Sequence, residues 1–107
     1  MTQFKDREKG FEAKFAQEEE REFKALARRN RLLGLWAADQ MGYFGDAAEA
    51  YAQEVVKADF EEAGQEDVYR KVKGDLAAKG MDISEHRVRR KMDELLATAR
   101  QQVAKEG

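Results

Sequence analysis

The chain has 107 residues, enough for one domain with a core of modest size. Charged residues make up 39% of it and hydrophobic residues 42%, while proline and cysteine are absent. This composition is typical of a charged helical protein and excludes a disulfide-stapled or collagen-like one. The formal net charge is only -2, from 20 basic and 22 acidic side chains. A general polyanion-binding surface is therefore not expected, and neither is nucleic acid as a partner.

The apolar segments are too short to span a membrane. The longest run, residues 32–38 (LLGLWAA), is far below the roughly 18 residues that a membrane-spanning helix needs. The N-terminus carries basic charge but is not followed by the apolar region of a secretory signal. We therefore expect no direct membrane insertion and take the cytoplasm as the default location.

The first predicted helix spans residues 6–40 and carries one continuous apolar face. At about 100° per residue, its large apolar side chains fall within a single arc. They are Phe4, Phe11, Phe15, Leu26, Leu33 and Trp36. Such a helix would be roughly 50 Å long, longer than a domain of this size is wide. Part of it must therefore project, bend back or be unfolded.

Two helices are predicted in the middle of the chain. Asp46 is placed as the N-cap of one, and Gly64 follows its end. The other lies between residues 65 and 80, with acidic residues in its first turn and Gly80 as its C′ residue. Gly74 is a weak point inside it. Its apolar residues recur one turn apart: Val68, Val72 and Leu76.

A fourth helix is predicted to begin after Ser84 and to close the chain. Ser84 is a well-placed N-cap, and Ile83 before it can pack on Val88 as a hydrophobic staple. Because the predicted connections are short, consecutive helices should pack antiparallel. The sequence thus predicts an all-α, up-and-down four-helix bundle whose long first helix begins with a mobile arm. Residues 1–22 form the predicted arm and residues 23–107 the bundle domain.

The arm, residues 1–22, has too little apolar surface to fold by itself. Burying its three phenylalanines would contribute roughly 5 to 9 kcal/mol, whereas fixing its backbone costs about 1 to 2 kcal/mol per residue before hydrogen bonds offset part of it. An isolated helix of this length is marginal in water, and Gly10 weakens it further. We expect a segment that is disordered when free and becomes helical in the groove of a partner. The alternative is that the phenylalanines fold back onto the bundle as extra core.

No catalytic or metal site is predicted. His86 is the only histidine, so a two-histidine metal site cannot be built within one chain. It is expected to be solvated in the first turn of the fourth helix, the alternative being a pH-sensing partner contact. The only serine, Ser84, is explained by its cap, and no phosphate-binding glycine motif is present. We predict no catalytic residue, no metal and no cofactor, in a chain that is not an enzyme.

Two basic clusters, residues 28–31 (RRNR) and residues 86–91 (HRVRRK), are expected to be solvated helical faces. The alternative is contact with an acidic protein surface. Weak nucleotide binding near these clusters would define a second candidate function, a nucleotide-binding or small-ligand-binding helical regulatory module. Trp36, Tyr43 and Phe44 are expected in the core and in the hinge that follows the first helix.

Four stretches of the sequence, taken in order, resemble one known family. They are DREKGFEAKFAQEEE (residues 6–20), FKALARRNRLLGLWAA (residues 23–38), YAQEVVKADFEEAGQEDVYRKV (residues 51–72) and ISEHRVRRKMDELL (residues 83–96). Together they resemble the zeta subunit of the alphaproteobacterial F-type ATP synthase, an ATPase inhibitor family. The resemblance extends over nearly the whole chain.

This resemblance implies a small four-helix protein that binds the catalytic F1 sector and blocks ATP hydrolysis. Its N-terminal segment would become helical in an alpha/beta catalytic interface near the central stalk. The implied partners are the F1-ATPase alpha, beta and gamma subunits, and the implied location is cytoplasmic, peripheral to the inner membrane through the ATP synthase. Carried onto this chain, the inhibitory segment covers residues 1–19. Its candidate partner-binding residues, chosen by side-chain type and position, are Phe4, Arg7, Phe11, Lys14 and Phe15.

Overall fold

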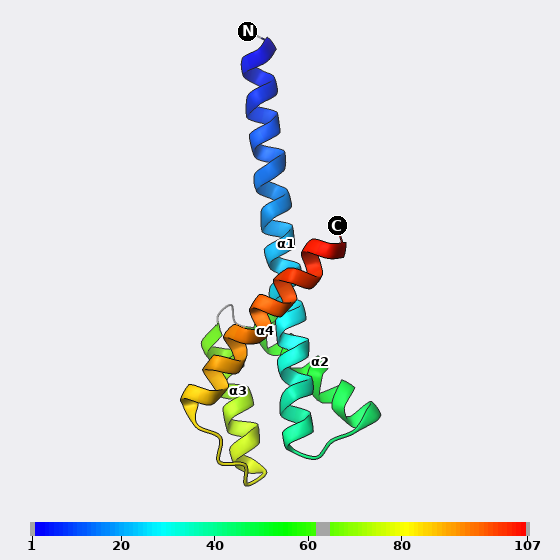
Figure 1. Ribbon diagram of the computed structural model, residues 1–107, viewed down its shortest axis with the longest axis vertical. Coiled ribbons are helices and arrows are strands. Elements are labelled where there is room, and N and C mark those ends of the chain that lie inside the picture. The colour runs from blue at the N-terminus through cyan, green and yellow to red at the C-terminus, as the bar shows by residue number, and fades with distance from the viewer. Residues whose placement is uncertain (1, 62–64, 107) are drawn as a thin grey trace.

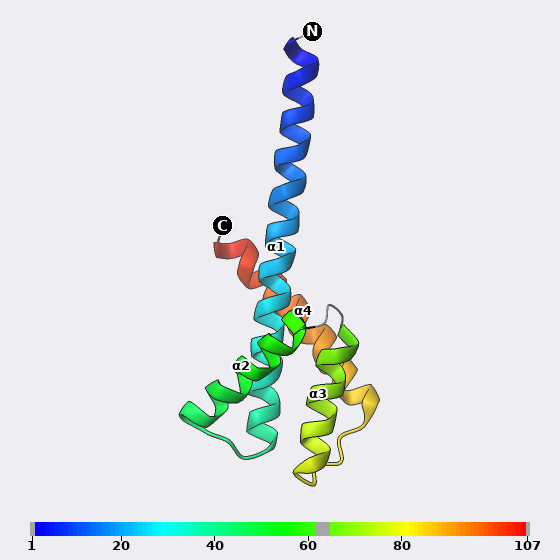
Figure 2. The same ribbon diagram turned by 180° about the vertical axis from the view of Figure 1, so that it is seen from behind.

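Four α-helices make up the part of the chain that the structure describes, α1 (Thr2–Gln40), α2 (Gly45–Glu61), α3 (Gln65–Ala78) and α4 (Glu85–Glu106) (Figure 1). This computed structural model describes residues 2–61 and 65–106, with side chains for residues 14–59 and 65–106. Successive helices run in opposite directions, as both views show (Figures 1 and 2). The predicted all-α fold with a long first helix is confirmed.

The C-terminal half of α1 lies at the centre of the packing. Both α2 and α4 pack closely against it, and α3 packs between them at the side (Figures 1 and 2). The main core takes large side chains from all four helices: Leu33, Tyr51, Val55, Val68, Val72, Leu76, Val88 and Met92. The apolar stripe predicted for α3 lies inside this core and is confirmed.

Glycines in the left-handed conformation end α1 and α3. At the end of α3, Gly80 has a φ of 79°. Its N–H donates to the carbonyl of Ala77 at 2.9 Å, and the N–H of Met81 donates to the carbonyl of Leu76 at 2.9 Å. These two bonds form a Schellman motif, which confirms the predicted role of Gly80. Gly42, with a φ of 80°, ends α1 in the same way.

The predicted start of α4 is also confirmed. The Oγ of Ser84 accepts a hydrogen bond from the backbone N–H of Arg87 at 3.1 Å, which is the N-cap geometry. Ile83 and Val88 are both buried in the main core, where a hydrophobic staple would place them.

The start of α2 lies two residues before the predicted one. The helix begins at Gly45, because the carbonyl of Phe44 accepts the N–H of Ala47 at 3.2 Å and so forms the first turn. Asp46 therefore lies within that turn rather than at the N-cap, where its carboxylate still faces the positive end of the helix dipole. Gly64, expected beyond the end of α2, lies outside the described residues.

Helices α1 and α2 approach each other closely at Gly34. A Cβ atom built on Gly34 would lie 2.6 Å from the Cα of Ala52 and 3.2 Å from Cγ2 of Val55. A Cβ atom does not come so close to a backbone carbon, so only glycine allows the two helices to lie at this distance. In contrast, a Cβ built on Gly74 of α3 meets nothing within 4 Å.

These two glycines form a matched pair of test positions. Gly34→Ala should lower the free energy of unfolding by about 1 to 3 kcal/mol, because the helices must separate. Gly74→Ala should raise it by about 0.5 to 1 kcal/mol, because alanine is the better residue in a helix interior. Urea denaturation followed by circular dichroism measures both. A stabilising Gly34→Ala change would contradict the close crossing of α1 and α2.

Candidate partner-binding site

The N-terminal half of α1 projects beyond the other helices (Figures 1 and 2). Every residue from Lys14 to Arg21 is exposed, and partial burial begins at Glu22. Ala25, at 1% exposure, is the first fully buried residue described on this helix. The packed part of α1 thus starts in the turn that follows Arg21.

Two of the five candidate site residues have described side chains. Lys14 and Phe15 are neighbours on the projecting part of α1, and Phe15 is 55% exposed. Phe4, Arg7 and Phe11 lie within the helical backbone, but their side chains are outside the described residues. The ring of Phe15 is therefore not folded back onto the bundle as extra core, which was the alternative expected from the sequence.

Two ion pairs join α1 to the C-terminal half of α4 at the base of the arm. Arg100 donates hydrogen bonds to both carboxylate oxygens of Glu22, at 2.6 and 3.2 Å. Arg28, six residues further along α1, donates to Glu106. Between these pairs lies a small apolar cluster formed by Ala25, Ala99 and Val103. The last turns of α4 therefore hold α1 where the arm leaves the bundle.

Arginine hydrogen bonds lower the pKa of both carboxyl groups at the base of the arm. The bond from Arg100 holds the pKa of Glu22 below its ordinary value of 4.5, although partial burial opposes this. The bond from Arg28 does the same for the pKa of Glu106. A carboxyl with a lowered pKa stabilises the fold above its ordinary pKa and loses this contribution as the pH falls through the lowered value. The base of the arm should therefore loosen only below pH 4.5.

Titration of the carboxyl groups by NMR tests the two ion pairs at the base of the arm. Glu22 and Glu106 should both titrate with midpoints below 4.5 in the natural chain. In the Arg100→Gln variant, the midpoint of Glu22 should move up towards 4.5 while that of Glu106 stays low. Equal midpoints for Glu22 in the two proteins would show that the pair with Arg100 does not form in solution.

The basic cluster at residues 28–31 is not a solvated face, so this prediction is wrong at its centre. Arg29 is 1% exposed and Asn30 is 0% exposed, and Nε of Arg29 donates to Oδ1 of Asn30 at 2.8 Å. Arg31 is exposed but donates to Glu49 of α2 at 2.6 Å. The reason is that α2 and α4 both cover α1 here, so that more of its circumference is buried than one apolar stripe predicts.

Burial of Arg29 leaves its charge incompletely paired. Burial lowers the pKa of Arg29, while the charges of Asp59 and Asp93 oppose that shift. Nη1 of Arg29 and Nδ2 of Asn30 are buried donors that have no acceptor among the described residues. Burial of these two side chains consequently lowers the free energy of unfolding. The pair does not form a basic surface that a ligand could reach.

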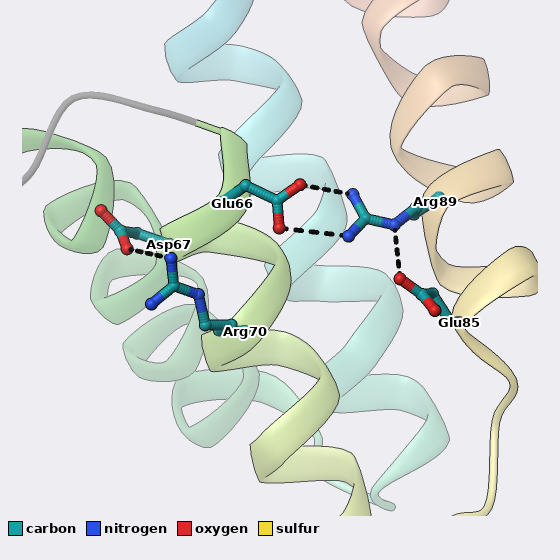
Figure 3. Close-up of polar contacts among 5 residues, drawn as sticks. All are labelled: Glu66, Asp67, Arg70, Glu85 and Arg89. Atoms are coloured by element: carbon teal, nitrogen blue, oxygen red, sulfur yellow. Dashed lines mark hydrogen bonds and ion pairs between the residues drawn. The ribbon is translucent and has the colours of Figure 1, made fainter.

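The second basic cluster, residues 86–91, is largely matched by acidic neighbours. Arg89 donates to both oxygens of Glu66 in α3, at 2.9 and 3.1 Å, and to Glu85 at 3.0 Å (Figure 3). These hydrogen bonds raise the pKa of Arg89 above its ordinary value. Its guanidinium also lies 4.0 Å from the centre of the Tyr69 ring. Arg89 therefore joins α3 to α4 and is not available to an anion.

The exposed members of this cluster agree with the predicted solvated face. His86, Arg87 and Arg90 are exposed. Arg90 and the half-buried Lys91 both approach Glu94, at 3.5 and 3.2 Å. Since most of these cations already face carboxylates, neither cluster offers concentrated positive charge to a nucleotide phosphate.

A cavity of about 390 Å³ opens between α2 and α3, at the end of the bundle away from the arm. Two of its walls are the rings of Tyr43 and Tyr51, which meet edge to face with their centres 6.3 Å apart. The hydroxyl of Tyr51 donates to Asp75 at 2.9 Å. Burial, and secondarily this hydrogen bond, raises the pKa of Tyr51. Sequence analysis missed the cavity, because Tyr51 lies in an apolar stripe and Asp75 is 24 residues away on another helix.

Tyr43 and Phe44 lie in very different surroundings. Trp36 and Tyr43 are half-buried against the main core, as predicted. Phe44 lies in the connection between α1 and α2, but it is 78% exposed, so its assignment to the core is wrong. Left-handed glycines on both sides, Gly42 and Gly45, turn the chain there. Such a turn can direct consecutive side chains to opposite sides.

Neither a membrane span nor a metal site is found in the described residues. Among the described helices, none combines the length and apolar character that crossing a bilayer requires. Over the same residues, no group of three or more His, Cys, Asp or Glu side chains is arranged to hold a metal ion. The projecting half of α1, exposed from Lys14 to Arg21, is the candidate site that the sequence predicted.

Comparison with protein families matches residues 1–102 to ATPase inhibitor subunit zeta. The chain belongs to this family. The match covers the projecting half of α1 as well as the bundle, so the arm is part of the zeta subunit pattern. The family description is that of a regulatory inhibitor subunit rather than of an enzyme, and it implies an ATP synthase as the partner.

A solved structure supports the zeta fold. A solution NMR structure is 58% identical in sequence, with a TM-score of 0.69, and the match covers 79% of this chain and 96% of that chain. Among curated proteins, none matches this chain.

Proposed function

We propose that this zeta-family chain inhibits ATP hydrolysis by the F1 sector of an F-type ATP synthase, through an N-terminal segment held as a helix in a catalytic alpha/beta interface. The observation that carries the proposal is the projecting half of α1, which is exposed from Lys14 to Arg21. The proposed partners are the alpha, beta and gamma subunits. The chain would then lie at the cytoplasmic side of the membrane, attached through the synthase.

The shape of α1 suits insertion between subunits. At 1.5 Å per residue, the part from Thr2 to Glu22 extends about 30 Å, and a helix with its side chains is roughly 10 to 12 Å across. A rod of this size can enter an interface that opens and closes during catalysis, while the bundle stays outside. Once inside, it would act as a wedge that stops the interface from closing and the rotor from turning.

The arm has the properties of a segment that is ordered by its partner. Lys14 to Arg21 are all exposed, although the end of α4 lies beside the last of them, and Phe15 is more than half exposed. Glu18 and Glu22 are four residues apart, a spacing at which like charges destabilise an isolated helix. That the free arm, residues 1–22, is disordered stays a prediction. Ordering it on binding would cost several kcal/mol of the gross contact energy, which keeps the inhibition reversible.

Deleting residues 1–19 should abolish inhibition and leave the bundle folded. The expected reason is that the first described hydrogen bond between α1 and another helix is at Glu22, so the deletion removes only exposed side chains that lie beside the end of α4 or beyond it. Hydrolysis assays with F1 from the source organism measure inhibition, and thermal unfolding measures the bundle, whose melting temperature should change by only about a few degrees. Full inhibition by the shortened chain would refute the proposed function.

The Phe11→Ala plus Phe15→Ala variant should weaken inhibition by about tenfold or more, because buried aromatic anchors usually dominate an interface. Its melting temperature should stay close to that of the natural chain, since Phe15 is exposed on the free protein. The matched control is Gln17→Ala, an exposed position about 200° around the helix from Phe15. A large drop in melting temperature for the double variant would instead identify the rings as core.

A further inference from the structure

The end of the molecule opposite the arm presents an aromatic ring on a fixed turn. Phe44 is 78% exposed, the highest value among the large apolar side chains that the structure describes. The N–H of Tyr43 donates to the carbonyl of Ala38 at 2.8 Å, and the carbonyl of Phe44 accepts the N–H of Ala47 at 3.2 Å. The backbone is therefore held on both sides of the ring. Nothing in the packing of the bundle requires a phenylalanine at this position.

The surroundings of Phe44 are acidic. Residues 39–56 contain four carboxylates and no basic side chain: Asp39, Asp46, Glu49 and Glu54. Glu49 and Glu54 face Arg31 and Lys71 from other helices. Asp39 and Asp46, on either side of Phe44 in the sequence, are exposed and have no ion pair among the described residues. The two carboxylates nearest the ring in the sequence are thus free of described ion pairs, while the nearest described cation, Lys79, lies over the ring of Tyr43.

The cavity between α2 and α3 adjoins this ring. Met41, Tyr43 and Ala47, which precede and follow Phe44, all contribute to its lining. Ala50 and Ala78 supply small side chains on its two walls. The lining also includes Glu54, Asp75 and Lys79. A protruding apolar ring next to a hollow with apolar walls and a few charged groups is the arrangement expected of a surface that interlocks with another protein.

We propose that Phe44, Asp39, Asp46 and the adjoining cavity, here called the Phe44 end, form a second docking surface that binds a basic protein surface with an apolar pocket for the ring. The proposal rests on the proposed function in one respect, that the basic surface belongs to the ATP synthase. Unpaired carboxylates at Asp39 and Asp46 complement basic side chains and disfavour phosphates and anionic lipids.

The length of α1 separates this contact from the one made by the arm. From Thr2 to Gln40, α1 extends about 58 Å, and the whole molecule is 65 Å long. Phe44 follows the last turn of α1, so it cannot share a binding pocket with the tip of the arm. The two ends therefore have separate tasks: the arm inhibits, and the Phe44 end holds the chain on the complex.

This division predicts that changes at the Phe44 end weaken binding without lowering maximal inhibition. Both quantities are measured with the full-length chain and purified ATP synthase from the source organism. Phe44→Ser should raise the Kd about tenfold or more, while hydrolysis at saturating chain is inhibited as completely as by the natural protein. Asp39→Asn combined with Asp46→Asn should make the Kd less dependent on salt. Because Phe44 is exposed, the Phe44→Ser variant should have the same melting temperature as the natural chain.

A second variant tests the hollow without altering Phe44. Ala50→Gln places a long polar side chain at the cavity wall and should also weaken binding severalfold. Its matched control is Ala97→Gln, at an exposed alanine of α4 that does not line the cavity. If Ala97→Gln weakens binding as much as Ala50→Gln does, the cavity is not part of the interface and the proposal is overturned.

Three other results would also overturn it. One is an unchanged Kd for Phe44→Ser, and another is a loss of maximal inhibition with the Kd unchanged. The third is a sedimentation result in which the natural chain is a dimer and Phe44→Ser is a monomer, because a second copy of the chain would then be the occupant. Failure of the proposed function is distinguishable, since it would be seen as full inhibition after deletion of residues 1–19.

Discussion

The unequal lengths of the helices determine the shape of this protein. Helix α1 has 39 residues, whereas α2, α3 and α4 have 17, 14 and 22. The first described hydrogen bonds between α1 and another helix are at Glu22, where the last turns of α4 reach it through Arg100. The helix before that point is exposed from Lys14 onward, although Gln17 to Arg21 still lie beside the end of α4. A protein that uses a long helix in this way has a folded part for attachment and an uncovered part for contact.

Because α2 and α4 cover α1 on two sides, polar side chains near the middle of α1 are buried, and this burial lowers the stability of the fold. Gly34 allows α2 to approach closely on one side, and Arg29 with Asn30 is enclosed where α2 and α4 meet the helix. Buried donors without acceptors reduce stability by about 1 to 3 kcal/mol each. Apolar residues of similar size often make such sites more stable, so the pair lowers the stability that this packing could otherwise reach.

The sequence predicted local structure better than the environment of individual side chains. The four helices, the cap at Ser84 and the turn at Gly80 follow from residue type and periodicity, and the structure confirms them. Burial of Arg29 and exposure of Phe44 could not be predicted, because they depend on which helices lie on either side. The projecting part of α1 was foreseeable from its length, whereas the cavity beside Tyr51 arises from residues on separate helices and from the turn before α2.

The unbroken course of α1 also has a mechanical consequence. Neither glycine nor proline occurs from Phe11 to Leu33, so the segment contains none of the usual points of bending. About 30 Å of this helix lies before Glu22, and about 27 Å follows, with Leu33, Ala37 and Ala38 fully buried in the main core. A sideways load on the tip would therefore be carried along the rod into the packed core, where the contacts of the other helices resist it.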